Sequence, residues 1–154
     1  MPNPSGSDSN REWIEIYNTT DNAIDLTDLK ILKDSTSKSI TSFTSGNEIQ
    51  PHSYFVIAKK DAATSGLPNV DAISAFSLTN SGTHTITIKI NSEIIDSISY
   101  TSSSDGKSWQ VDPALKDHDL NDYSFAWCKG STEISADNTD KGTPGAENQD
   151  CSSK

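Results

Sequence analysis

The sequence has few basic residues, few apolar residues and no long hydrophobic run. Lysine and arginine number 12 against 22 aspartates and glutamates, which gives a formal net charge of −10. Nucleic-acid affinity comes mostly from basic side chains that displace counterions from phosphates, so this balance argues against nucleic-acid binding. No stretch approaches the roughly 18 apolar residues of a membrane span, and no signal-peptide core stands at the N-terminus.

The motifs of the common enzyme classes are missing as well. The three histidines, His52, His84 and His118, lie in separate segments of the chain. No G-x-S-x-G, H-E-x-x-H or glycine-rich phosphate loop occurs. We therefore expect a protein that is not an enzyme and that needs no cofactor.

Cysteine is scarce, and its placement is informative. Cys128 and Cys151 are the only two cysteines. In an acidic chain rich in serine and threonine, we predict that they form a disulfide that links the C-terminal tail to the last strand. Two unpaired thiols are the alternative. A disulfide is typical of oxidising compartments, so the expected location is secreted or cell surface, with the signal peptide of a precursor lying outside this sequence.

What the chain does contain is a series of short strand patterns. With 154 residues and a hydrophobic fraction of 32%, one domain must place its apolar residues economically, as half-buried strands do. Residues 13–17 alternate, and the apolar run 54–58 is typical of a strand buried on both faces. Strict alternation in 85–90 and the return of 94–100 predict a hairpin.

About nine short strands with no amphipathic helix between them predict an all-β, antiparallel sandwich. We expect a single domain over residues 1–154, with 1–11 as a flexible N-terminal turn region and 129–154 as a C-terminal loop and tail. Asp96 lies at an alternate position with Ile94, Ile98 and Tyr100 and is therefore expected on the same, apolar face of its strand. Either a bulge re-aims this carboxylate, or it faces inward and is hydrogen-bonded.

Seven fragments, in order, resemble the lamin tail domain of exported bacterial proteins. The segment 12–18 (EWIEIYN) is similar to the family's opening motif, and 49–57 is similar to its proline-led central strand. The other matches lie at 25–29, 78–82, 95–100, 106–110 and 142–148. The residues that carry the family pattern are Glu12, Trp13, Glu15, Asn18, Asp96, Trp109, Pro144 and Gly145.

The resemblance implies an immunoglobulin-like β-sandwich and a non-catalytic structural, tethering or protein-interaction role in an exported bacterial protein. The implied partners are a protein, the cell envelope or neighbouring domains of the same precursor. The acidic surface argues against the chromatin role of animal members. The family usually begins with an apolar strand before the Asn-Pro-rich turn, here residues 1–10, and this sequence has no such strand. We therefore expect an open sheet edge, available for dimerisation with a second copy.

A ligand-binding accessory module next to an extracellular hydrolase is the alternative function. Trp13 and Tyr17 share one face of their strand, and exposed aromatic faces stack on sugars, although tryptophans in such a chain are more often core. Asp117, Asp119 and Asn121 have the alternating spacing of oxygen ligands in a calcium loop. A solvated acidic loop with Asx turns is the simpler interpretation of that segment.

Overall fold

The computed structural model describes residues 1–136 and 138–151. Its strands are β1 (Trp13–Tyr17), β2 (Ile24–Asp25), β3 (Leu29–Lys33), β4 (Thr36–Phe43), β5 (Glu48–Ile49), β6 (Tyr54–Ala58), β7 (Ala72–Ser74), β8 (His84–Ile90), β9 (Glu93–Tyr100), β10 (Trp109–Val111), β11 (Trp127–Lys129), β12 (Glu133–Ser135) and β13 (Asn138–Lys141). Its helices are α1 (Asp8–Arg11), α2 (Ala62–Ser65) and three 3-10 turns at Pro113–Leu115, Leu120–Asp122 and Ser124–Ala126. No helix in this described part of the chain is long and apolar enough to cross a membrane.

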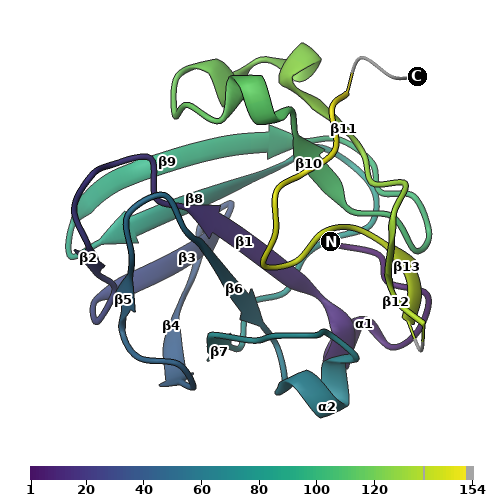
Figure 1. Cartoon of the computed structure of the whole chain (residues 1–154), viewed down its shortest axis with the longest axis horizontal. Coiled ribbons are helices and arrows are strands. Elements are labelled where there is room, and N and C mark those ends of the chain that lie inside the picture. The colour runs from purple at the N-terminus through teal and green to yellow at the C-terminus, as the bar shows by residue number, and fades with distance from the viewer. Residues whose placement is uncertain (137, 152–154) are drawn as a thin grey trace.

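Seven strands form one curled sheet in the order β1-β6-β7-β4-β3-β8-β9. All neighbouring strands are antiparallel except β6 and β7, which are parallel. Two-stranded pairs β10-β11, β12-β13 and β2-β5 complete the β structure. In Figure 1 the 3-10 turns lie above β9, and β1 crosses the middle of the molecule. The predicted all-β sandwich is confirmed, with one parallel pair that the sequence did not predict.

The core has two parts, and β6 lies between them. Phe55 and Ile57 point into a large cluster inside the curl of the sheet, whereas Val56 and Ala58 point into a smaller cluster on the opposite face. All four are at most 3% exposed. Successive side chains of a strand point to opposite faces, so an unbroken apolar run is what a doubly covered strand requires.

The hairpin of β8 and β9 forms as the alternation predicts. Asn91 takes up the left-handed conformation, with φ 56°, at its turn. The register shifts by one residue after the Ile88–Asp96 pair, which leaves Ile95 without a partner on β8. The hairpin therefore contains a bulge immediately beside Asp96.

The two ends of the chain are more structured than the sequence indicated. Residues 1–11, expected as a flexible turn region, pack against the body: Met1 is 6% exposed and the Ser5 main-chain N–H donates to Asp140 at 3.0 Å. The expected loop and tail contains β12 and β13. Residues 137 and 152–154 of that tail lie outside the described residues.

Candidate functional site

An apolar groove of about 610 Å³ lies between β1, the β8-β9 hairpin and β10. Isoleucines from three strands make up much of its wall, namely Ile14, Ile16, Ile86, Ile88, Ile90 and Ile98. The two end strands of the large sheet, β1 and β9, both border it. Ligand sites are mostly apolar hollows of about 300–1,000 Å³, so the groove has the size of a binding site.

One wall of the groove carries unpaired main-chain groups. β1 pairs with β6 on one side, where the Lys59 N–H donates to the Glu12 carbonyl at 3.2 Å. In an antiparallel ladder alternate residues bond to the same neighbour, so the N–H and C=O groups of Trp13, Glu15 and Tyr17 point to the other edge. At Glu15 and Tyr17 these groups have no main-chain partner among the described residues. β1 therefore offers an open edge to the groove.

Met1 occupies the beginning of this open edge. Its ammonium donates to the Trp13 carbonyl at 2.6 Å, and its carbonyl accepts from the Trp13 N–H at 3.4 Å. Two residues that exchange both bonds form one rung of an antiparallel ladder. Burial lowers the pKa of the Met1 amino group to about 5. Met1 and Trp13 thus form one antiparallel rung on this edge, and no described residue forms the rungs opposite Glu15 and Tyr17.

Glu15 brings a carboxyl group to the same wall. Its Oε2 accepts the Gly145 N–H at 2.5 Å. Burial raises the pKa of Glu15 to about 7, a shift that the Gly145 bond and the Met1 ammonium oppose and that repulsion from Asp71 reinforces. Near neutral pH this carboxyl is therefore a mixture of an acceptor-only carboxylate and a form that also donates.

Aromatic rings and a lysine lie at the far end of β1. The rings of Tyr17 and Tyr54 are 4.8 Å apart between centroids, and the Lys116 Nζ lies 4.3 Å from the Tyr17 centroid. Lys116 also donates to the Tyr54 hydroxyl at 3.2 Å and to Glu147 at 3.0 Å. These contacts draw together β1, β6, the 113–126 segment and the C-terminal tail, and they limit the groove at this end.

The opposite rim, on β9, is exposed and apolar. Ile94 is 59% exposed and Ile95 is 45% exposed, and both border the groove. Beside them Asp96 accepts hydrogen bonds from the Asn121 side chain at 2.8 Å and from the Ser97 N–H at 2.7 Å. Burial raises the pKa of Asp96, and these bonds partly offset the shift. The sequence predicted either a bulge or hydrogen bonds at this carboxylate, and the structure has both.

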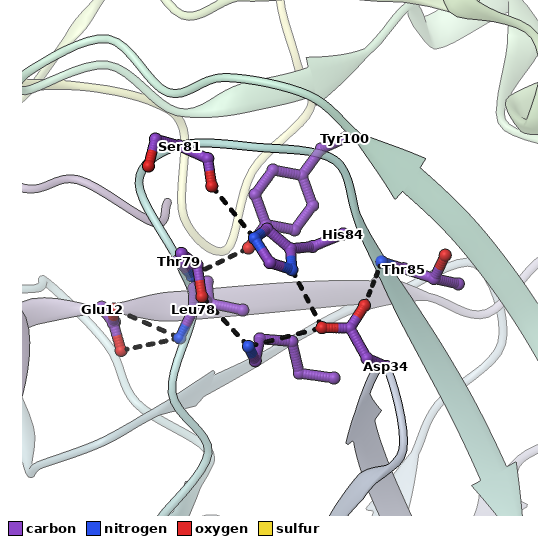
Figure 2. A network of polar contacts seen from close by, with 9 residues as sticks. Glu12, Asp34, Leu78, Thr79, Ser81, His84, Thr85 and Tyr100 are labelled. Carbon is purple, nitrogen blue, oxygen red and sulfur yellow. Dashed lines mark hydrogen bonds and ion pairs between the residues drawn. The ribbon is translucent and has the colours of Figure 1, made fainter.

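Figure 2 shows a polar network around the beginning of β8, and its hydrogen bonds hold neighbouring segments of the fold together. Asp34 accepts from the Thr85 N–H at 3.0 Å and contacts His84 Nδ1 at 2.9 Å, which together hold the pKa of Asp34 at about 2. The His84 Nε2 faces the main-chain carbonyl of Ser81 at 3.0 Å instead of its hydroxyl. Both ring nitrogens are engaged, so this Asp-His pair is not arranged to activate a serine.

The opening family motif supplies a buried charge to the same network. Glu12 is fully buried, and its two carboxylate oxygens each accept from the Leu78 N–H at 3.2 Å. Lys59 donates to its Oε2 at 3.0 Å. Burial raises the pKa of Glu12 against these hydrogen bonds. Glu12 thereby fixes the 78–80 turn to β1, which is a positioning role within the fold.

The other motif residues also make connections within the fold. Asn18 donates to the carbonyls of Asn22, Ile49 and Gln50 and so joins the end of β1 to the following turn and to residues 49–50. The Lys129 Nζ lies over the Trp109 ring, 3.5 Å from the ring centroid. Pro144 is buried, and Gly145, with φ 81°, presents its N–H to Glu15.

The predicted sugar-stacking face needs correction. Trp13 is only 5% exposed and packs with Met1 and Val56 in the smaller core cluster. Its ring is covered because residues distant in sequence cover that face of β1. Trp13 and Tyr17 both border the groove, but Lys116 covers the ring of Tyr17, with its Nζ 4.3 Å from the ring centroid. The two aromatic residues therefore do not form an exposed platform.

The predicted calcium residues are only partly brought together. Carboxylate oxygens of Asp117 and Asp119 lie within 4.8 Å of each other and of a His118 ring nitrogen, and all three residues are exposed. The Asp117 carboxylate already accepts the Asp119 N–H at 2.9 Å, which is an Asx turn. Asn121 donates to Asp96 instead. The geometry matches the simpler interpretation, a solvated acidic loop.

The disulfide between Cys128 and Cys151 is present, with a Cα–Cα distance of 5.6 Å. The pairing of the two cysteines is as predicted, but β11, which the disulfide joins to the tail, is not the last strand, because β12 and β13 follow it. The Cys151 N–H also donates to Asp112 at 2.9 Å. The tail is thereby held against the 109–112 segment next to the groove.

Sequence reasoning missed the groove and the residues that define it. The pattern placed Glu15 on the face opposite Ile14 and Ile16 but gave no sign that both faces of β1 are covered. A glutamate inside an otherwise apolar strand motif was the one available signal for Glu15. Ile94 and Ile95 are adjacent, so one of them had to face solvent, and this pair indicated an exposed rim.

Comparison with known families identifies a match to the Lamin Tail Domain family over residues 1–102. The match includes β1 to β9, and with them both end strands that border the groove. Comparisons with curated proteins and with solved structures find no match.

Proposed function

Because the chain belongs to the lamin tail domain family, we propose that it is a protein-interaction module that tethers an exported bacterial protein to its partner. The family is immunoglobulin-like and non-catalytic. A module of this kind acts through its surface, so the relevant feature is a surface that is built for contact. The partner is a protein of the envelope, a neighbouring domain or a second copy.

The observation that carries this proposal is the open groove between β1 and β9. An exposed apolar hollow and an unpaired strand edge are both features that soluble proteins normally cover. Here they coincide, with a volume of about 610 Å³. Exposed Ile94 and Ile95 on the rim extend the apolar surface. Contact with a protein partner accounts for the apolar hollow and for its exposed rim.

Two further observations support export and a protein partner. The Cys128–Cys151 disulfide fits an oxidising compartment. The net charge of −10 disfavours nucleic acid as the partner. The alternatives, carbohydrate binding and calcium-stabilised adhesion, have less support, because Trp13 is buried and Asn121 is directed at Asp96.

Site-specific photo-crosslinking tests the proposal. A photoreactive amino acid replaces Ile94 at the groove in one variant and Ser37, exposed on the distant strand β4, in a matched control. Both positions tolerate a large side chain because both are exposed. In a bacterium that exports the protein, we expect one covalent adduct of defined mass from position 94 and none from position 37. Equal labelling from both positions, or none from either, would contradict a groove-mediated role.

A further inference from the structure

We propose that two stacked aromatic rings, those of Tyr123 and Phe125, form a platform that binds arginine side chains from a basic segment of a partner protein. The platform lies on the connection between β10 and β11, and neither ring is among the residues that border the groove. It also lies outside residues 1–102, which the family match includes. The proposal therefore goes beyond the proposed function and does not depend on what fills the groove.

The two rings are exposed and ordered relative to each other. Phe125 is 66% exposed and Tyr123 is 55% exposed, the highest values among the aromatic residues in the described part of the chain. Their centroids are 5.3 Å apart and their planes differ by 15°, so the rings stack on each other. Leu120, in the preceding 3-10 turn, is exposed as well. Aromatic residues are enriched in protein interfaces, and a cluster of exposed apolar side chains marks a contact surface.

The segment that carries the rings is longer than its connection requires. Two residues are enough to join an antiparallel pair of strands, whereas residues 112–126 join β10 to β11. Figure 1 shows the turns of this segment above β9. Long connections that are ordered within compact domains are commonly binding loops. The length and order of this segment therefore agree with a binding role for the rings at its outer side.

Hydrogen bonds along the inner side of the segment hold the platform in place. The Asn121 side chain donates to Asp96 at 2.8 Å. The Asn121 carbonyl accepts from the Trp127 indole at 2.5 Å. The Ala126 N–H donates to the Tyr123 carbonyl at 2.9 Å and closes the last 3-10 turn. A surface that is already ordered loses less conformational entropy on binding, so these bonds favour contact at the rings.

The charges of the segment favour a cationic partner. The face of an aromatic ring carries partial negative charge and attracts a cation. The only lysine of the segment, Lys116, is directed away from the rings, since it donates to the Tyr54 hydroxyl at 3.2 Å and to Glu147 at 3.0 Å. Three exposed carboxylates lie in the same segment, those of Asp117, Asp119 and Asp122. Rings and carboxylates therefore attract the same kind of side chain.

Arginine suits both parts of this surface. Its planar guanidinium stacks on aromatic rings while its N–H groups donate to carboxylates, whereas lysine offers a compact point charge. A second copy of this chain does not supply such a group. Arg11 is the only arginine in the sequence, and it donates to the carbonyls of Ser65 at 3.2 Å and Ser5 at 3.4 Å. Two copies with a net charge of −10 each also repel one another, so the partner is a different, basic protein.

An NMR titration of the full chain with a synthetic peptide tests the proposal. The probe is acetyl-Ser-Arg-Ser-Arg-Ser-amide. The control peptide replaces each arginine by citrulline, which has nearly the same shape and no charge. We expect the ring signals of Tyr123 and Phe125 to shift with the arginine peptide, and its affinity to exceed that of the citrulline peptide by about tenfold.

A matched variant separates the rings from the carboxylates. Tyr123→Leu combined with Phe125→Leu keeps apolar side chains at two exposed positions, so the fold is retained, but it removes the ring faces. Binding to this variant is followed through the backbone amides of residues 119–126. We expect the ratio of the two affinities to fall to about threefold, because the carboxylates still attract the charge.

Three results would overturn the inference. Equal affinity for the two peptides, or unshifted ring signals, would show that the platform does not recognise the cation. An unchanged ratio in the leucine variant would show that the rings take no part. Ring signals that shift with cellotriose and not with the arginine peptide would assign the platform to carbohydrate. None of these results changes the crosslink at position 94, so the proposed function is tested separately.

Discussion

The buried carboxyl group of Glu15 predicts a specific dependence of stability on pH. Burial in the groove wall raises its pKa from 4.5 to about 7. A group whose pKa is higher in the folded state stabilises that state while it is protonated. Its contribution is fully present below pH of about 4.5 and is lost as pH rises through about 7. The replacement Glu15→Gln removes this titration and keeps a carbonyl oxygen that accepts the Gly145 N–H.

The magnitude follows from the size of the pKa shift. One pKa unit corresponds to about 1.4 kcal/mol. The shift of the Glu15 pKa from 4.5 to about 7 therefore changes the free energy of unfolding by about 3 kcal/mol between these two pH values. The Met1 amino group, whose pKa falls from 8.0 to about 5, acts in the opposite sense and adds stability as pH rises. Because both proteins contain Met1, its contribution largely cancels in their difference. The difference curve therefore isolates Glu15.

Urea unfolding at a series of pH values measures the effect. We expect the free energy of unfolding of Glu15→Gln to gain about 3 kcal/mol relative to the original protein between pH of about 4 and 8. Glu48→Gln, which removes the same charge from exposed strand β5, is the control and should follow the original curve. A constant difference between Glu15→Gln and the original protein across this range would refute the description of Glu15 as a buried, raised-pKa carboxyl.

Three other changes give distinct expected results. Glu12→Ala leaves the Leu78 N–H and the Lys59 charge without their buried acceptor, so chemical denaturation should show a loss of about 3–5 kcal/mol; a loss below 1 kcal/mol would contradict this role. Cys151→Ser opens the loop that the disulfide closes, and thermal melting should show a loss of about 3 kcal/mol; an unchanged midpoint would show that the tail needs no covalent link. The acidic loop 117–121 makes its own Asx turn, so calcium and chelator should give equal melting midpoints; a rise with calcium would establish a metal site.

The elements that the sequence predicted well are those whose pattern depends on local periodicity. The run Tyr54–Ala58 predicted a strand covered on both faces because every side chain in it is apolar. The hairpin of β8 and β9 followed from strict alternation around Asn91. The alternation of side chains alone indicated a carboxylate, Asp96, on an apolar strand face. In the structure a bulge lies beside Asp96, and the Asn121 amide donates a hydrogen bond to it.

What the sequence could not predict depends on contacts between distant segments. β7 (Ala72–Ser74) is too short to show alternation, and its parallel pairing with β6 has no local signal. The apolar run 125–127 is typical of a strand, yet only Trp127 belongs to β11, because Phe125 and Ala126 lie in the 3-10 turn Ser124–Ala126. The candidate site was missed for the same reason. A groove is the space left between elements, and no window of sequence encodes it.

For the proposed tethering function, the disulfide at Cys151 has a mechanical consequence. A pulling force applied on the C-terminal side of Cys151 reaches Cys128 through a covalent bond, so residues 129–150 carry almost none of it. The load passes directly into β11, which is held to β10 by the Trp109–Lys129 register. The tail that supports Glu15 through Gly145 is thereby shielded from tension. Under load, the groove wall would keep its shape until the β10-β11 pair itself gives way.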